Sequence, residues 1–281
     1  MDIKVYDIEI YPNLLPIGAK NIVTGEKETY AIHEKRNDLE AILEFIDKKH
    51  ALIGYNLKKF DNLLLYHISL NRKRFLTEKP LMVVRELKDI ANEIIRYQNK
   101  KIEITDRIKA LYRHKSFRYL DLLAIINTVN RTSLKQISVN LKWWNIQTLP
   151  YPHDKWLTDE EIEVVLDYMF NDCDITEQLY IAKKKDVDLR KDIKNRWDVD
   201  VTNVNDTGIA KMILNKYYSE ATGIAVKDFE NLRSYNKAFS LKSIVFPVFN
   251  FKTKPFQELM VWLNSKIYNA LKKVQIEKAG K

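Results

Sequence analysis

Val5-Tyr6-Asp7-Ile8-Glu9, near the N-terminus, is the stretch that decides the fold prediction. The alternation around it is typical of a strand, and side chains two residues apart on a strand share a face. Asp7 and Glu9 therefore lie side by side, with Tyr6 and Ile8 on the other face. Paired carboxylates on an apolar strand are costly unless a cation such as Mg²⁺ or Mn²⁺ binds them. An edge strand with its polar face in water is the alternative.

A second carboxylate follows the next predicted central strand, 51–55. In Gly54-Tyr55-Asn56-Leu57-Lys58-Lys59-Phe60-Asp61, the apolar strand ends at Asn56, and Asp61 opens a predicted helix over 60–70. This position lies at the rim of the sheet, where ligands collect in α/β folds. The alternative is that Asp61 only interacts favourably with the helix dipole in the first turn.

A third signal, Tyr168-Met169-Phe170-Asn171-Asp172, lies in a long predicted helix. Thr158 and Glu161 form a predicted capping box at its start, and the helix is expected to continue through 163–183. Positions i and i+4 share one helical face, so the phenol and the last carboxylate are presented together. An ordinary amphipathic helix with a half-buried tyrosine is the simpler alternative for this segment alone.

The remaining pattern predicts an α/β fold with a mixed sheet flanked by helices. Strands are expected over 2–10, 14–23, 28–33, 51–55 and 117–125, and helices over 38–49, 60–70, 81–97, 133–141 and 158–183. Residues 72–116 form a predicted basic insertion. The last hundred residues are expected to be mainly helical, with a strand over 245–251.

Together, the three carboxylate segments resemble the DEDD superfamily of 3′→5′ exonucleases in order, spacing and predicted element. The third segment is similar to the tyrosine-bearing branch, because the other branch has histidine where this chain has Asp167. The resemblance covers about residues 2–185 and implies a ribonuclease H-like exonuclease domain, 1–185. The Asn-x-x-x-Phe-Asp segment further resembles the proofreading domain of family B DNA polymerases, especially those of phages.

The resemblance implies that the chain hydrolyses phosphodiester bonds with two Mg²⁺ ions, for which Mn²⁺ is a possible substitute. The ions of such sites lie about 3.5–4 Å apart. Asp7 would bridge both ions, Glu9 and Asp172 would hold the one that carries the attacking water, and Asp61 would anchor the other. Tyr168 would position the water, since a phenol with a pKa of about 10 is a poor base at neutral pH.

The sequence departs from a complete polymerase of that family. It has neither the Ser-Leu-Tyr-Pro nor the Tyr-x-Asp-Thr-Asp motif of the polymerase palm. The chain is therefore expected to be a free-standing nuclease, a subunit of a split polymerase or an N-terminal part of one, with 186–281 as a possible docking region for a separate polymerase chain. Residues 203–210 and 244–251 loosely resemble the segments C-terminal to the exonuclease domain in such polymerases. An RNA-directed exonuclease and a non-catalytic primer-end or polymerase-binding subunit are the alternatives.

The charge distribution suits a polyanionic partner such as single-stranded DNA or a primer 3′ end. The net charge is +9, of which 71–118 carries +8 and 186–281 carries +6, so the remainder is acidic. A solvated basic helical face is the alternative for the insertion. The predicted nucleic-acid-binding residues are Asn56, Lys58, Lys59, Phe60, Arg72 and Arg74.

Other residues give expectations about the cellular compartment and about the surroundings of the site. Cys173 is the single cysteine, which excludes a disulfide framework and makes cytoplasm, the host's if the protein is phage-encoded, the expected location. No apolar run reaches the roughly 18 residues of a membrane helix. Asp121 is expected to support the site from behind or to cap a helix, and Asp174 to lie at the surface. Trp143-Trp144 is a predicted core or interface pair.

Overall fold

The computed structural model describes residues 2–48, 50–114, 117–126, 132–232, 238–243 and 251–269. The chain divides into two compact units, Met1–Leu214 and Asn215–Lys281. The first unit thus continues past residue 185, the predicted end of the exonuclease-like part. Most of the strand predicted over 245–251 lies outside the described residues.

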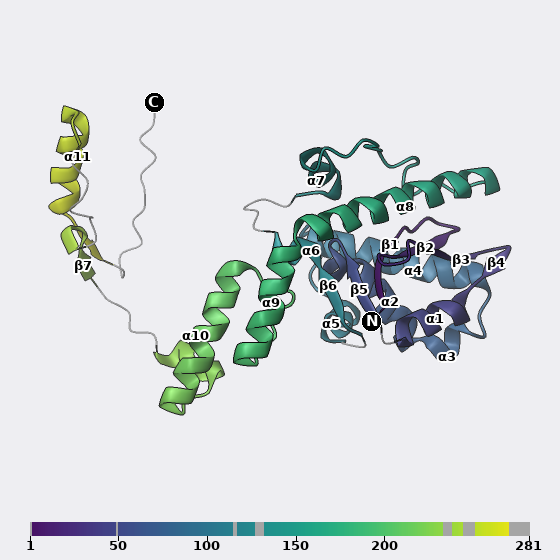
Figure 1. Ribbon diagram of the computed structural model, residues 1–281, viewed down its shortest axis with the longest axis horizontal. Coiled ribbons are helices and arrows are strands. Elements are labelled where there is room, and N and C mark those ends of the chain that lie inside the picture. The colour runs from purple at the N-terminus through teal and green to yellow at the C-terminus, as the bar shows by residue number, and fades with distance from the viewer. Residues whose placement is uncertain are drawn as a thin grey trace. The chain divides into compact units, whose positions relative to one another are not determined.

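The first unit is an α/β structure around a mixed sheet of six strands in the order β4-β3-β2-β1-β5-β6 (Figure 1). Neighbours from β4 to β1 pair antiparallel, and β1, β5 and β6 pair parallel. The predicted α/β class and mixed sheet are therefore confirmed. The strands are β1 (Ile3–Ile8), β2 (Leu15–Asn21), β3 (Lys27–His33), β4 (Arg36–Asn37), β5 (Ala51–Gly54) and β6 (Tyr119–Asp121).

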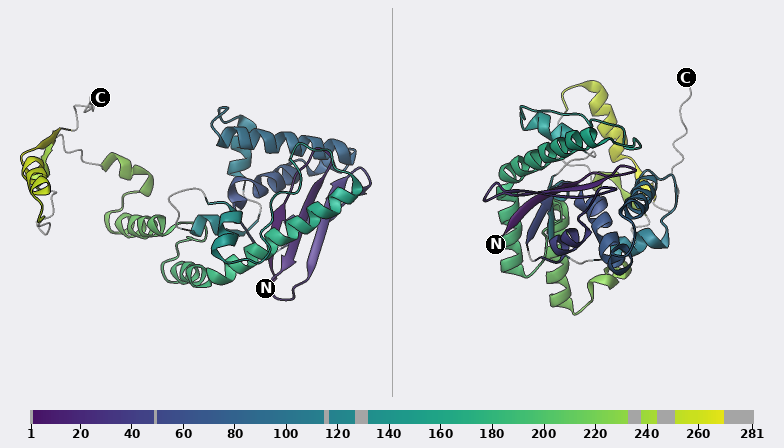
Figure 2. Two further views of the ribbon diagram at one scale, coloured as in Figure 1. Left: turned by 90° about the horizontal axis from the view of Figure 1, so that it is seen from above. Right: turned by 90° about the vertical axis from the view of Figure 1, so that its right-hand side faces the viewer.

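Helices cover both faces of the sheet, which Figure 2 shows edge-on in its right-hand view. One face carries Tyr6 and Ile8 and forms a core with α1 to α5, and the other carries Val5 and Ile53 and forms a core with α6 to α8. The first group is α1 (Leu39–Asp47), α2 (Asp61–Leu70), α3 (Arg72–Phe75), α4 (Pro80–Gln98) and α5 (Asp106–Arg113). The second group is α6 (Leu122–Ile125), α7 (Leu134–Asn140) and α8 (Asp159–Ala182).

The segment predicted as a basic insertion contributes a helix, α4, to the core. Along α4, the apolar side chains Val83, Leu87, Ile90 and Ile94 are almost completely buried. They belong to the same apolar cluster as β1, α1 and α2. The charged residues of α4 occupy the rest of the helix surface, which is the usual arrangement of an amphipathic helix.

The strand predicted over 117–125 is wrong beyond Asp121, because α6 begins at Leu122. The Asp121 carboxylate accepts a hydrogen bond of 3.1 Å from the backbone N–H of Leu123 and caps this short helix. A short apolar run does not distinguish a buried strand from a buried helix by periodicity. The predicted capping box of α8, in contrast, is confirmed at Thr158 and Glu161.

The C-terminal part is mainly helical where it is described, with α9 (Lys184–Trp197), α10 (Asp206–Thr222), a 3₁₀ segment (Val226–Leu232) and α11 (Lys254–Asn264). In the second unit, β7 (Ala238–Ser240) and β8 (Ile267–Asn269) pair antiparallel. None of the helices within the described ranges is both long and apolar enough to span a membrane.

Residues after 185 complete the first unit. The Asn203 side chain accepts from the Asp121 backbone N–H at 2.7 Å and donates to the Tyr119 carbonyl at 3.0 Å, so it pairs with β6 at the edge of the sheet. The buried Arg190 guanidinium on α9 donates to the carbonyl of Val204 and to the carboxylate of Asp206. These contacts fasten the segment after α9 to the sheet.

Candidate metal centre

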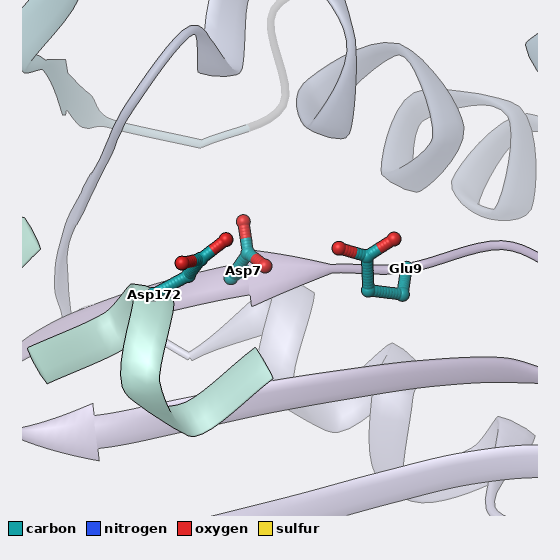
Figure 3. Close-up of side chains that lie close together, drawn as sticks. All are labelled: Asp7, Glu9 and Asp172. Carbon is teal, nitrogen blue, oxygen red and sulfur yellow. The ribbon is translucent and has the colours of Figure 1, made fainter. Parts of the chain in front are cut away.

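Three carboxylates from two elements meet above one end of β1 (Figure 3). Asp7 lies on β1, Glu9 follows one residue beyond its end, and Asp172 comes from α8. One carboxylate oxygen from each lies within 4.8 Å of the other two. Glu9 was predicted inside the strand, and its backbone N–H still bonds to the Pro16 carbonyl at 3.3 Å. The extended backbone therefore keeps Asp7 and Glu9 on one face.

Gly18 on β2 lies where side chains of α8 pack against the sheet. Gly18 pairs directly with Asp7 in the sheet. A Cβ atom at this position would lie 2.7 Å from the Cε of Met169, which is much shorter than a van der Waals contact. The Cys173 thiol also points at this strand, with its Sγ 3.7 Å from the Gly18 carbonyl oxygen. The Met169 side chain of α8 therefore occupies the space that a side chain at position 18 would need.

The turn between β5 and α2 positions Asp61. Asn56 adopts a left-handed conformation with φ of 64°, which asparagine tolerates better than most residues. The buried Asp121 carboxylate accepts the backbone N–H of Asn56 at 2.9 Å and that of Lys58 at 3.0 Å. Asp121 thus supports the turn from behind and also caps α6, so both alternatives predicted for it apply.

Asp61 begins α2, as predicted, and is buried. It lies outside the three-carboxylate group but lines the same pocket of about 450 Å³ as Asp7, Glu9 and Asp172. Next to it, the buried Asn62 accepts a hydrogen bond from the Tyr6 hydroxyl. This bond fixes the start of α2 against β1.

Tyr168 lies one helical turn before Asp172 on α8, so the phenol and this carboxylate share one face of the helix. Burial, followed by the charges of Asp172 and Glu9, raises the pKa of the phenol. Tyr168 therefore stays protonated and acts as a hydrogen-bond donor near the carboxylates.

The carboxylates destabilise each other's charged forms. Burial, with repulsion from Asp172 and Asp61, raises the pKa of Glu9 to about 8. Burial raises the pKa of Asp61 to about 7 and that of Asp172 to about 6, and it holds the pKa of Asp7 well above its usual value. Close carboxylates of this kind require either protons or a cation. The group therefore has the ligands and the charge to hold a metal ion.

The predicted nucleic-acid-binding residues separate into three sets. Asn56, Lys59 and Phe60 line the carboxylate pocket. Lys58 lines a different pocket of about 660 Å³ beside β6. The two arginines lie on α3 and are engaged in ion pairs at the surface: Arg72 with Asp47, and Arg74 with Glu78 and Glu86.

Asp174, predicted at the surface, is partly exposed and pairs with Lys20 at 2.7 Å. The tryptophan pair divides: the Trp143 indole N–H donates to the Asn171 side chain at 2.9 Å, whereas Trp144 is 83% exposed.

The sequence did not indicate which basic residue of α4 would reach the pocket. Lys88, Ile95 and Gln98 line it, and the Gln98 amide donates to the Lys59 carbonyl. The seven-residue spacing from Lys88 to Ile95 places both on one face of a helix. That spacing alone does not reveal which neighbouring element the face meets.

Comparisons with protein-family models, with curated proteins and with solved structures gave no match. The functional assignment therefore depends on the residues and their geometry.

Proposed function

We propose that this chain is a metal-dependent 3′→5′ DNA exonuclease of the proofreading type. The observation that carries the proposal is the convergence of Asp7, Glu9 and Asp172 within 4.8 Å, with Asp61 lining the same pocket. Tyr168 lies one helical turn before Asp172 on α8. These are the four carboxylates and the tyrosine of the DEDD pattern, and the mixed sheet that supports them is compatible with a ribonuclease H-like fold.

The donor set fits Mg²⁺ or Mn²⁺. All the groups are carboxylates, and the single cysteine is buried with its thiol directed at β2 rather than at the pocket. Hard divalent cations prefer such oxygen ligands. Asp7, Glu9 and Asp172 would hold one ion, and Asp7 and Asp61 would hold a second. When bound, the metal supplies Lewis-acid polarisation of the phosphate and lowers the pKa of water.

The residues of the chain orient the substrate and the water around that centre. Tyr168, which remains protonated, donates a hydrogen bond that fixes the orientation of the attacking water for in-line displacement. Asn56 and Phe60, at the pocket wall formed by the β5–α2 turn, contact the 3′-terminal nucleotide. Asp121 acts through this turn and is a positioning residue.

The first experiment uses a 5′-labelled single-stranded DNA with Mg²⁺, and a matching RNA in parallel. A ladder that shortens from the 3′ end and is lost in EDTA is expected on DNA. Preferential degradation of RNA would redirect the proposal to an RNA exonuclease. Tight binding without degradation of either substrate would instead support a non-catalytic primer-end subunit.

Three variants test the assignment of roles. Asp7→Ala should reduce activity to background. Tyr168→Phe should keep Mn²⁺ affinity but slow turnover about 10- to 100-fold. The change removes the hydroxyl that orients the attacking water, and it leaves all the metal ligands in place. Asp167→Ala, an exposed change one residue from Tyr168, is the matched control and should behave as the unaltered protein. Equal loss of Mn²⁺ affinity in the Asp7 and Tyr168 variants would contradict this division of roles.

A further inference from the structure

The α4 helix forms a wall of the carboxylate pocket and brings one ammonium group to it. Lys88 is half-buried, and its Nζ donates to the backbone carbonyl of Ile10 at 3.2 Å. Ile10 directly follows Glu9, so this hydrogen bond fixes the lysine at the Glu9 end of the pocket. Lys88 and Glu9 both line that pocket.

Lys88 differs in its partners from the buried Lys4 and the half-buried Lys20 of the sheet. Lys4 and Lys20 each contact carboxylates directly, at distances of 2.5 to 3.7 Å. Lys88 has no carboxylate within ion-pair distance among the described residues, and one carbonyl is its hydrogen-bond partner there. An ammonium has three N–H donors, so donors remain available on the pocket side.

The charged groups around Lys88 leave its ammonium group without a direct counter-ion. Glu9 and Asp154 are the acidic groups that act on it across a distance, while burial opposes its charged form. Half-burying an ammonium group without a direct counter-ion is unfavourable, unless a bound anion replaces the water that the group has lost. A cation at this position also has a use in the pocket, because it offsets the repulsion between the four carboxylates and a phosphodiester.

We infer that Lys88 is a substrate-binding residue whose ammonium group contacts a non-bridging oxygen of the phosphodiester held at the carboxylate centre. The inference rests on the proposed function for the identity of the substrate, a single-stranded nucleic acid. It assigns to α4 a specific contact inside the pocket, in place of a diffuse basic surface along residues 72–116. A contact of this kind takes part in binding whatever the sequence of the strand.

Salt dependence of binding tests this contact without requiring turnover. Each phosphate that a cation neutralises contributes about 0.7 to the slope of log affinity against log salt for a single strand. Binding of a fluorescent oligothymidylate is measured in the Asp7→Asn background with Mg²⁺, so that the strand stays intact. Lys88→Met should weaken binding about tenfold and reduce the slope by about 0.7. Lys88→Arg, which keeps the positive charge, should retain the affinity and the slope of the parent protein.

The matched control is Arg96→Met, which removes an exposed cation from the same helix without altering the pocket. It should leave the slope unchanged. If Lys88→Met lowers the melting temperature, Lys88→Gln, which retains a donor for the Ile10 carbonyl, replaces it. An unchanged slope in the Lys88 variants, or the same reduction in Arg96→Met, would overturn the inference.

These outcomes are separable from those of the proposed function. Absence of nuclease activity in the unaltered chain would refute the exonuclease assignment, while the salt slope would still report whether Lys88 contacts phosphate. A Lys88 that only neutralises Glu9 would change Mn²⁺ affinity and leave the slope as it was. Either result in the Lys88 variants therefore decides the inference.

Discussion

At the scale of single residues, the carboxylate group is poised between two occupants, protons and metal. Burial and mutual repulsion raise the pKa of Glu9 to about 8, that of Asp61 to about 7 and that of Asp172 to about 6. In the unfolded chain these groups titrate near pH 4. The metal-free folded state therefore retains protons that the unfolded state has lost over the interval from about pH 4 to 8.

This difference fixes the sign of the pH dependence. Because the folded pKa values are raised, the stabilising contribution of these groups is complete below pH 4 and is lost as pH rises through 6 to 8. Without metal, the melting temperature should fall over that interval by more than in Asp7→Asn, which has one fewer carboxylate. Thermal melts at pH 5.5, 7 and 8.5 measure this. Parallel curves for the two proteins would contradict the pKa shifts.

Metal should reverse the effect, since it replaces protons on the same oxygens. The increase in melting temperature produced by about 10 mM Mg²⁺ or Mn²⁺, a concentration chosen to exceed the dissociation constant of a weak site, should grow from pH 5.5 to 8.5. A stabilisation that is constant across this range would indicate binding away from the carboxylates.

At the scale of elements, the turn from β5 to α2 depends on a single side chain. Asp121 accepts the backbone N–H groups of Asn56, Lys58 and Leu123 while almost fully buried. Asp121→Ala should cost about 2–4 kcal/mol, because it leaves these donors without a partner. Urea denaturation measures the loss, with Asp89→Ala on the exposed side of α4 as control. A loss below about 0.5 kcal/mol would mean that another group satisfies the turn.

The elements also show how far sequence patterns extend. The periods of β1, β2, α2, α4 and α8 and the capping box at Thr158 are local signals, and the structure has those elements where they were expected. The meeting of Asp7, Glu9 and Asp172 was expected from the resemblance of the three carboxylate segments to the DEDD pattern. The end of β6 was not predicted, because its last residue, Asp121, caps the helix that follows. The position of Lys88 was not predicted either, since it depends on how α4 packs against the sheet.

At the scale of the whole molecule, the part of the chain from α9 to residue 214 belongs structurally to the first unit. Val187 joins the core beneath α8, and Asn203 pairs with the edge strand β6. Since β6 contains Asp121, the same contacts also bear on the β5–α2 turn. The segment therefore stabilises the site although it supplies no ligand to it.

Truncation tests this dependence. A chain ending after Lys185 loses the buried Val187 and both hydrogen bonds of Asn203, and should be less stable by at least about 2 kcal/mol, or roughly 4–8 °C in melting temperature. A chain ending after Thr222, the last residue of α10, keeps these contacts and should melt within about 2 °C of the full chain, less than the shift that 1 kcal/mol produces. Equal melting temperatures for the two truncated chains would show that residues 186–222 are dispensable.

The buried thiol of Cys173 can report how often α8 separates from β2. Cys173 is the single cysteine, is fully shielded from solvent and sits between Asp172 and Asp174 on the helix that closes the site. A disulfide reagent can reach it only when α8 lifts from β2, so the rate of labelling measures that opening. A divalent ion that bridges β1 and α8 should slow the labelling. The ratio of the labelling rates without and with the ion would then give the free energy with which the ion stabilises the contact between α8 and β2.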